Sequence, residues 1–290
     1  FEDDFVPKGA RFTAKRSAAR KKLLSVANAL TGSDIAADAL IISTSGRYEF
    51  RNKGIDVFIE AINRLRFDDR LNKQVVAFIE VPGWLAGPRQ DLAERIASGE
   101  HFDSPLEMPM LTHWLHNMDN DNVLSMMRSL GMNNAKGDKV KLIFIPCYLT
   151  GDDGVLNMSY YDLVIGNDLC VYPSYYEPWG YTPLEAIAFK VPCITTDLAG
   201  FGLWANEEKG KDSDIEDGVQ VLHRTDYNYS DVADGIKDTI IRYAAMPKAS
   251  ADKCRSHAVK LSKKALWSKF IKYYEQAYDI ALHKAASRTL

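Results

Sequence analysis

The chain has 290 residues, of which 46% are apolar and 26% charged, and its net charge is −3. This composition is that of a globular protein, and the small net charge gives no indication of nucleic acid binding. No apolar run approaches the roughly 20 residues that a membrane span needs, so we expect no membrane partner. The four cysteines are scattered, with no Cys-x-x-Cys pair, and three lie in strand-like segments. We therefore expect reduced core thiols, which favours the cytoplasm.

The first part of the chain is polar and charged. Residues 1–7 are typical of an extended linker, and residues 13–30 predict a basic helix, so we treat 1–38 as a linker with a basic helical segment. Such a run of positive charge favours a solvated helix face over a partner site. The chain begins with Phe1 and shows no signal-peptide pattern, which we interpret as a fragment of a longer protein.

Apolar strand-like runs alternate with helical patterns from residue 39 onward. We predict strands at 39–45, 74–79, 139–145, 168–171, 191–196 and 219–223, and helices at 55–65, 88–98, 122–130, 159–165, 184–189, 231–244, 250–261 and 265–284. The alternation predicts an α/β fold with a mostly parallel sheet. Residues 101–121 look irregular. They contain His113 and His116, whose spacing could bind a metal on a helix, but no third ligand is evident and a chance pair is favoured.

Two cations follow the first predicted strand. Arg47 comes directly after it, and Lys53 precedes the next helix. Loops at the carboxyl ends of parallel strands form the ligand edge of an open α/β sheet. A planar guanidinium and a point charge together suit a pyrophosphate group. Ordinary surface charge is the alternative interpretation.

An aromatic turn, residues 172–186 with the sequence YPSYYEPWGYTPLEA, joins a buried strand to a helix. Thr182 is a suitable N-cap and Pro183 suits the first helical position, so the backbone N–H groups from Gly180 onward would form a phosphate site. The alternative is a capping box in which Glu185 bonds back to the Thr182 cap. Glu177 favours a functional turn, because a carboxylate in an aromatic turn contributes little to folding.

Glu177 and Glu185 are separated by seven residues, which resembles the Glu-x7-Glu motif of retaining glycosyltransferases with the two-domain GT-B fold. Three longer segments, SYYEPWGYTP (174–183), ITTDLAGFG (194–202) and GRYEFRNKG (46–54), resemble glycogen synthases of the eukaryotic type, glycosyltransferase family 3. The resemblance implies that residues 39–290 form the C-terminal, Rossmann-like nucleotide-sugar-binding domain with C-terminal helices. The N-terminal domain on the acceptor side would then be missing.

The resemblance also implies the ligands and the roles of single residues. The donor would be UDP-glucose or a related nucleotide sugar, the acceptor an α-1,4-glucan, and neither metal nor other cofactor is expected. The implied catalytic residues are Glu177, Arg47 and Lys53, and the implied substrate-binding residues are Glu185, Thr182, Gly180, Tyr181 and Tyr160. Arg47 and Lys53 would hold the donor phosphates, Glu185 the ribose hydroxyls and Tyr160 the base, although core packing is an equal alternative for Tyr160. Glu177 could act as a nucleophile or as an electrostatic stabiliser.

Other interpretations stay open at this point. A different GT-B transferase, such as a sucrose synthase type, or a non-catalytic nucleotide-sugar or glucan-binding module are the alternatives to a glucan synthase. A homo-oligomer is also kept open.

The C-terminal helices depart in part from the family pattern. The family places an arginine cluster that binds glucose 6-phosphate where residues 252–264 lie, and this chain keeps only Arg255 there, among lysines. We therefore predict weak or absent glucose 6-phosphate binding. The aromatic residues of 265–284 recur at helical spacing, which indicates a core face. In the GT-B fold, a helix at this place crosses back onto the first domain.

Overall fold

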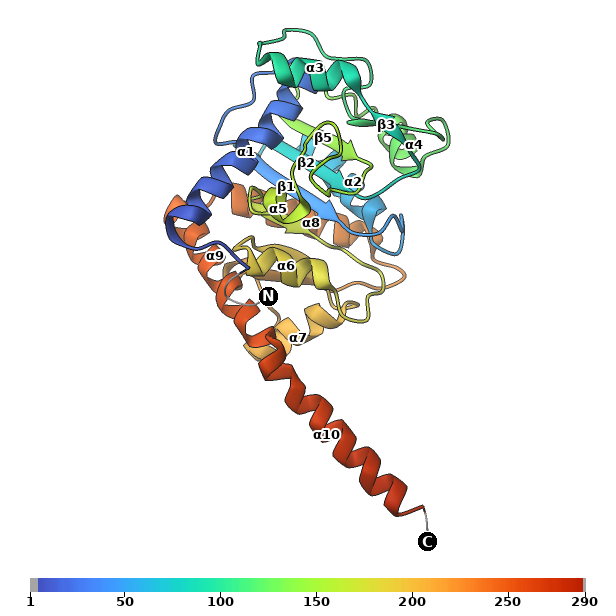
Figure 1. Cartoon of the computed structure of the whole chain (residues 1–290), viewed down its shortest axis with the longest axis vertical. Coiled ribbons are helices and arrows are strands. Elements are labelled where there is room, and N and C mark those ends of the chain that lie inside the picture. Colours follow the sequence, from blue (N-terminus) through green and yellow to red (C-terminus); the bar gives the residue numbers. More distant parts are fainter. Residues whose placement is uncertain (1–4, 289–290) are drawn as a thin grey trace.

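A parallel sheet of six strands forms the centre of the protein (Figure 1). The structure, a computed structural model, describes residues 5–288. The strand order is β5-β2-β1-β6-β7-β8. The strands are β1 (Leu40–Ser45), β2 (Val75–Glu80), β5 (Val140–Ile145), β6 (Leu169–Val171), β7 (Cys193–Thr196) and β8 (Val219–Leu222). The predicted α/β class with a Rossmann-like sheet is confirmed, and all six predicted strands are present.

Both faces of the sheet are covered by helices, which explains why the strands are continuous apolar runs. Successive residues of a strand point to opposite faces, so Ile42 packs in the cluster under α2, α4 and α8, whereas Ile41 packs in the cluster under α1 and α3. A third cluster joins β6, β7 and β8 to α5, α6, α7 and α9. All four cysteines are free and buried.

The helices agree with most of the predicted ranges. They are α1 (Gly9–Thr31), α2 (Ile55–Arg66), α3 (Gln90–Ser98), α4 (Asn122–Ser129), α5 (Tyr160–Val164), α6 (Tyr181–Ala188), α7 (Gly200–Lys209), α8 (Tyr229–Ala244), α9 (Lys248–Ser262) and α10 (Trp267–Ala286). Residues 1–4 of the expected linker lie outside the described residues. The helix α1 buries Leu23 and Leu30 against the sheet. The division of the chain at residue 38 stays a prediction.

The short strands β3 (Leu85–Pro88) and β4 (His113–Leu115) and the helix α7 were not predicted. The segment 101–121 is not wholly irregular, because β4 pairs antiparallel with β3. Both strands are short, and β3 contains glycine and proline, which weaken strand signals. The helix α7 begins at Gly200, in a segment for which the sequence predicts no helix.

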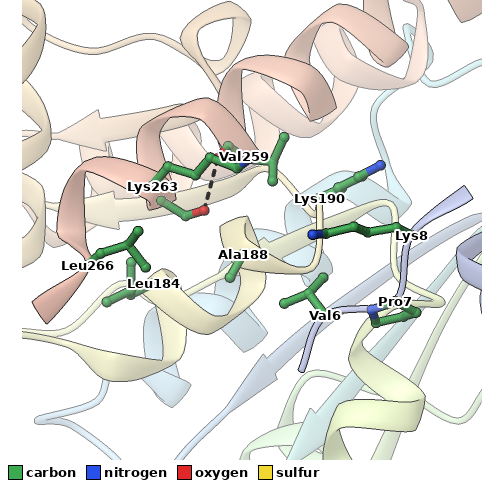
Figure 2. Close-up of a pocket in the computed structure, with 10 residues that line it drawn as sticks. Val6, Pro7, Lys8, Leu184, Ala188, Lys190, Val259, Lys263 and Leu266 are labelled. Atoms are coloured by element: carbon green, nitrogen blue, oxygen red, sulfur yellow. Dashed lines mark hydrogen bonds between the residues drawn. The ribbon is translucent and has the colours of Figure 1, made fainter. Parts of the chain in front are cut away.

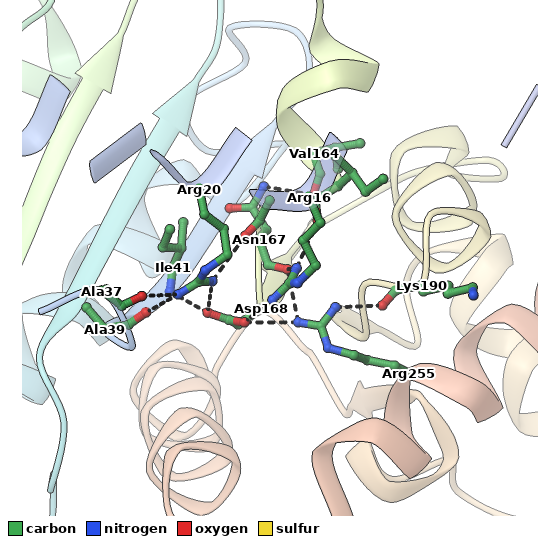
Figure 3. Close-up of polar contacts among 12 residues, drawn as sticks. Arg16, Arg20, Ala37, Ala39, Ile41, Val164, Asn167, Asp168, Lys190 and Arg255 are labelled. Atoms are coloured by element: carbon green, nitrogen blue, oxygen red, sulfur yellow. Dashed lines mark hydrogen bonds and ion pairs between the residues drawn. The ribbon is translucent and has the colours of Figure 1, made fainter. Parts of the chain in front are cut away.

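The basic run of α1 is not a solvated face throughout. Arg16 and Arg20 bind the carboxylate of Asp168, at 2.5 Å and 2.7 Å, and Arg255 of α9 binds it at 2.9 Å (Figure 3). Burial raises the pKa of Asp168, but the three guanidinium groups outweigh it and hold that pKa below its usual value. The cluster joins α1 and α9 to the start of β6.

The helix α10 leaves the body of the protein, as Figure 1 shows. Most of its aromatic side chains are exposed, including Trp267 at 58% and Tyr278 at 62%. The prediction of a core face is therefore wrong for this helix. Phe270 is the exception, because its ring packs on Trp179 and Trp204, with centroids 5.3 Å and 5.9 Å away. Within residues 5–288, no helix is both long and apolar enough to cross a membrane.

Candidate functional site

The loop 46–54 and the turn 173–180 meet at the carboxyl ends of β1 and β6. The backbone N–H of Tyr175 donates to the carbonyl of Asn52 at 2.7 Å. Gly54 has a φ of +69°, and a Cβ there would lie 2.0 Å from the carbonyl oxygen of Pro173. Only glycine permits this approach. The two segments are thus fixed side by side, which brings Lys53 to Glu177.

Lys53 and Glu177 form a direct ion pair at this edge. The Nζ atom of Lys53 donates to the Glu177 carboxylate, and the two side chains are 17% and 20% exposed. The backbone of Glu177 is also held, because Gly200 N–H donates to its carbonyl at 3.0 Å. A Cβ on Gly200 would lie 2.2 Å from the carbonyl oxygen of Pro178. Glycine at position 200 therefore lets the start of α7 approach the turn.

Arg47 lies apart from this pair. Its side chain is 77% exposed and binds Glu49 at 2.9 Å. The structure therefore brings Lys53 to Glu177 and leaves Arg47 at the mouth of the site. A long side chain at the solvent edge remains free to turn toward a ligand.

The turn begins α6 differently from the prediction. Gly180, with a φ of +108°, is the N-cap of α6, and no side chain of the described residues caps this helix. Thr182 is the second helical residue, so both its predicted N-cap role and the capping box with Glu185 are wrong. Glycine at a positive φ starts the helix earlier than the Thr-Pro pair indicates. Tyr181 is 73% exposed and points to solvent.

Glu185 faces a different partner. The hydroxyl of Tyr161 donates to its Oε1 atom at 3.0 Å. Burial raises the pKa of the Glu185 carboxyl, and the Tyr161 hydroxyl partly offsets this effect. The carboxylate thus lies inside the site and does not serve the helix end.

A cavity of about 320 Å³ opens between these elements and the ends of β2 and β5. Its lining includes Arg47, Tyr160, Thr182 and Glu185. The hydroxyl of Tyr160 lies 3.1 Å from Ser45 Oγ, and burial raises the Tyr160 pKa well above its usual value. Tyr160 also packs beside the third core cluster, which agrees with the core-packing alternative, and its contact with a base stays a prediction.

The model of the glycogen synthase family matches residues 33–86 and 100–289, which is most of the chain. The chain belongs to the glycogen synthase family. It is 29% identical to glycogen [starch] synthase of Neurospora crassa over 86% of this chain and 42% of that protein. It is 28% identical to the human liver enzyme and 26% identical to isoform 2 of Saccharomyces cerevisiae, over 85% of this chain in both cases. The chain spans less than half of these relatives, at 42% and 43% of their length.

Solved structures of glycosyltransferases show a weaker likeness. A sucrose-phosphate synthase from Thermosynechococcus elongatus is 20% identical, with a TM-score of 0.47 over 86% of this chain and 47% of that one. Anabaena HepE, in complex with UDP-glucose, is 15% identical, with a TM-score of 0.47 over 91% of this chain and 51% of that one. The assignment to the glycogen synthase family rests on the family model.

Sequence reasoning missed two buried residues beside the candidate site. Arg224 is 5% exposed, donates to the carbonyl of Pro173, and lies 5.4 Å from the ring centroid of Tyr175. Glu80 ends β2 at the cavity. Arg224 lies after a short strand, and no sequence motif marks it. Glu80 had a detectable signal, because it is a charged residue at the end of a continuous apolar strand.

One group of residues has the composition of a metal site. The ligand atoms of His113, Cys147 and Asp153 lie within 4.8 Å of one another, whereas His116 is exposed and packs on Trp84. The His113 ring is bonded to the Asp153 carbonyl at 3.0 Å, and the Asp153 carboxylate accepts backbone N–H groups of residues 155–157. Burial raises the pKa of Cys147 to about 12, which opposes a thiolate ligand. These hydrogen bonds hold the loop after β5 in place.

A second cavity, of about 250 Å³, lies between α6 and α9 (Figure 2). Three lysines, Lys8, Lys190 and Lys263, surround an apolar wall that includes Leu184 and Leu266. Neither Glu177 nor Glu185 lines it. This cavity is therefore separate from the candidate site.

Proposed function

We propose that this chain is the donor-binding half of a retaining glucosyltransferase that extends an α-1,4-glucan from UDP-glucose. The contact between Lys53 and Glu177 carries the proposal, because it places a cation and a carboxylate at the ligand edge, beside the first turn of α6. Membership of the glycogen synthase family supports the substrate class. Of the motif residues, Arg47, Thr182 and Glu185 line one cavity, which supports a retained donor site.

The proposed chemistry uses the charges of this edge. A nucleoside diphosphate leaves the anomeric carbon, and negative charge develops on its phosphate. Lys53, Arg47 and the N–H groups of the first turn of α6 stabilise that charge. Lys53 exchanges its bond with Glu177 for a phosphate oxygen, which releases the Glu177 carboxylate toward the sugar ring. Glu177 then acts as a nucleophile or stabilises an oxocarbenium-like state.

The remaining residues orient the nucleoside in this proposal. Glu185 accepts hydrogen bonds from the ribose hydroxyls, and Tyr160 packs on the base. Thr182, Gly180 and Tyr181 form the turn under the phosphates. No metal is required, because the protein supplies the positive charge.

The partners follow from the same proposal. The acceptor glucan binds to an N-terminal domain of the same protein, and the exposed aromatic face of α10 packs on that domain. Burial of all four free thiols supports a reducing compartment, which is the cytoplasm. A homo-oligomer stays open.

Two measurements test the proposal. Calorimetry on this chain should show that Arg47→Ala weakens UDP binding roughly 10- to 150-fold while uridine binding changes little, because a charge-assisted hydrogen bond is worth about 1.5–3 kcal/mol. Equal losses for both ligands would indicate a folding role instead.

In an enzyme that includes the N-terminal domain, Glu177→Gln should lower turnover by orders of magnitude and leave UDP affinity near normal. Unchanged turnover would favour a non-catalytic binding module.

A further inference from the structure

Glu80 is a buried carboxyl group without a partner. It is the last residue of β2, it is 5% exposed, and neither carboxyl oxygen has a hydrogen-bond partner in the described part of the chain. Burial raises its pKa to about 8. By contrast, the buried carboxylate of Asp168 binds three guanidinium groups. Burying an unpaired carboxyl group costs folding free energy, so its place at the end of this strand indicates a ligand.

Glu80 lies at the far side of the candidate site from Glu177. It is in register with Ser45 of β1 and Ile145 of β5, and it is one of the residues that line the same cavity as Arg47 and Tyr160. Neighbouring strands are about 4.8 Å apart. The proposed phosphate contacts lie at β1 and β6, so the part of the cavity that extends over β2 and β5 is left for the nucleoside. This places Glu80 beside the base.

We propose that Glu80 is a base-recognition residue, whose protonated carboxyl group turns into the cavity and forms a pair of hydrogen bonds with the edge of the nucleobase. This inference rests on the proposed function. A protonated carboxyl group presents one donor and one acceptor side by side. These match the O4 and N3–H groups of uracil. The ionised carboxylate only accepts hydrogen bonds, so it could not donate one to the O4 atom of uracil.

The hydrogen bonding of Glu80 does not oppose this movement. The carboxyl oxygens of Glu80 are covered in the ligand-free protein. Among residues 5–288, no hydrogen bond holds them there, so turning the side chain into the cavity breaks none within that range. In the cavity, the carboxyl group gains two hydrogen-bond partners, which are the O4 and N3–H groups of the base.

Two substitutions separate recognition from folding. Glu80→Gln keeps one donor and one acceptor in the same shape and should bind UDP within about threefold of wild type. Glu80→Leu loses both hydrogen bonds and should weaken UDP roughly 5- to 150-fold, while inorganic pyrophosphate affinity stays unchanged. Glu80→Leu should also raise the melting temperature, because it removes an unpaired buried acid. Glu94→Gln, on the exposed face of α3, is the matched control and should change neither property.

Calorimetry and thermal melts of the intact chain supply the results. Unchanged UDP affinity in Glu80→Leu would overturn the inference, as would equal losses for UDP and pyrophosphate. Wild-type protein that does not bind UDP at all would reject the proposed function and this inference with it. Wild-type binding that Glu80→Leu leaves intact rejects only the inference.

The pH dependence supplies a readout that a structural role would not move. Other titratable or charged groups also face the cavity, namely Arg47, Cys147, Tyr148, Tyr160, Tyr161 and Glu185. The Glu80→Gln variant keeps all of them, so the ratio of its UDP affinity to that of wild type isolates Glu80. Between pH 6.5 and 8.5, wild-type affinity should fall relative to the variant, approaching about tenfold per pH unit above the Glu80 pKa. A ratio that does not change with pH overturns the proposal.

Discussion

Single residues of the site have partners that the sequence does not reveal. Glu185 was compatible with a capping box, but its carboxylate accepts the Tyr161 hydroxyl, from a different helix. Lys53 and Glu177 are 124 positions apart along the chain, and their contact depends on the close approach of Gly54 to Pro173. The motifs thus singled out Lys53 and Glu177, whereas their contact depends on the packing of backbone segments that are distant in sequence.

The Glu185 contact gives the first prediction at the residue scale. Glu185→Gln should weaken UDP binding without lowering the melting temperature, because no helix cap is lost. Calorimetry and thermal melts measure the two effects. Tyr161→Phe, which removes the donor and keeps the ring, should weaken UDP less than Glu185→Gln does. A Glu185→Gln variant that is less stable but binds UDP normally would restore the capping interpretation.

At the scale of elements, the sequence predicted the sheet well because its strands are buried on both faces and appear as continuous apolar runs. The three-residue β4 and the glycine-started α7 were missed, since their stability comes from pairing and packing with distant segments. The basic residues of α1 were misread in part for the same reason. Arg16 and Arg20 belong to a cluster whose centre, Asp168, is 152 and 148 positions away from them.

That cluster gives the second prediction. Asp168→Asn removes the charge that three guanidinium groups share, and it should lower the free energy of unfolding by about 3 kcal/mol at pH 7. The folded-state pKa of Asp168 is depressed, so its stabilisation is present above the unfolded-state value of about 4 and is lost as pH falls through the folded-state value. The stability difference between wild type and variant in urea titrations should therefore shrink below about pH 4. A difference that stays constant down to pH 2 would contradict this assignment.

The helix α9 gives the third prediction, on regulation. Arg255, the only arginine of the stretch 252–264, donates to Asp168 and to the carbonyls of Lys190 and Asn167. Its guanidinium is therefore occupied inside the protein. We expect glucose 6-phosphate to bind weakly or not at all in a calorimetric titration. Saturable sub-millimolar binding that is lost in Arg255→Ala would show that the site is retained.

At the scale of the whole molecule, the chain spans only 42% and 43% of the length of its human and yeast relatives. We predict that residues 1–290 bind a uridine nucleotide but transfer little or no glucose to glycogen. Addition of the N-terminal domain in the same polypeptide should restore transfer, as measured by incorporation of labelled glucose. Robust synthesis by this chain alone would contradict the proposal that glucose transfer needs both domains.

The helix α10 has a mechanical consequence for such a whole protein. Its 20 residues correspond to a rod of about 30 Å, and the described contacts of its aromatic rings with the body gather at Phe270, near one end. Phe270 rests on Trp179, two residues after Glu177. Phe270 therefore connects α10 to the turn that carries Glu177. A second domain or a second copy that binds the exposed part of α10 would therefore also act on that turn. By reciprocity, the conformation of the turn would change how strongly this partner binds α10.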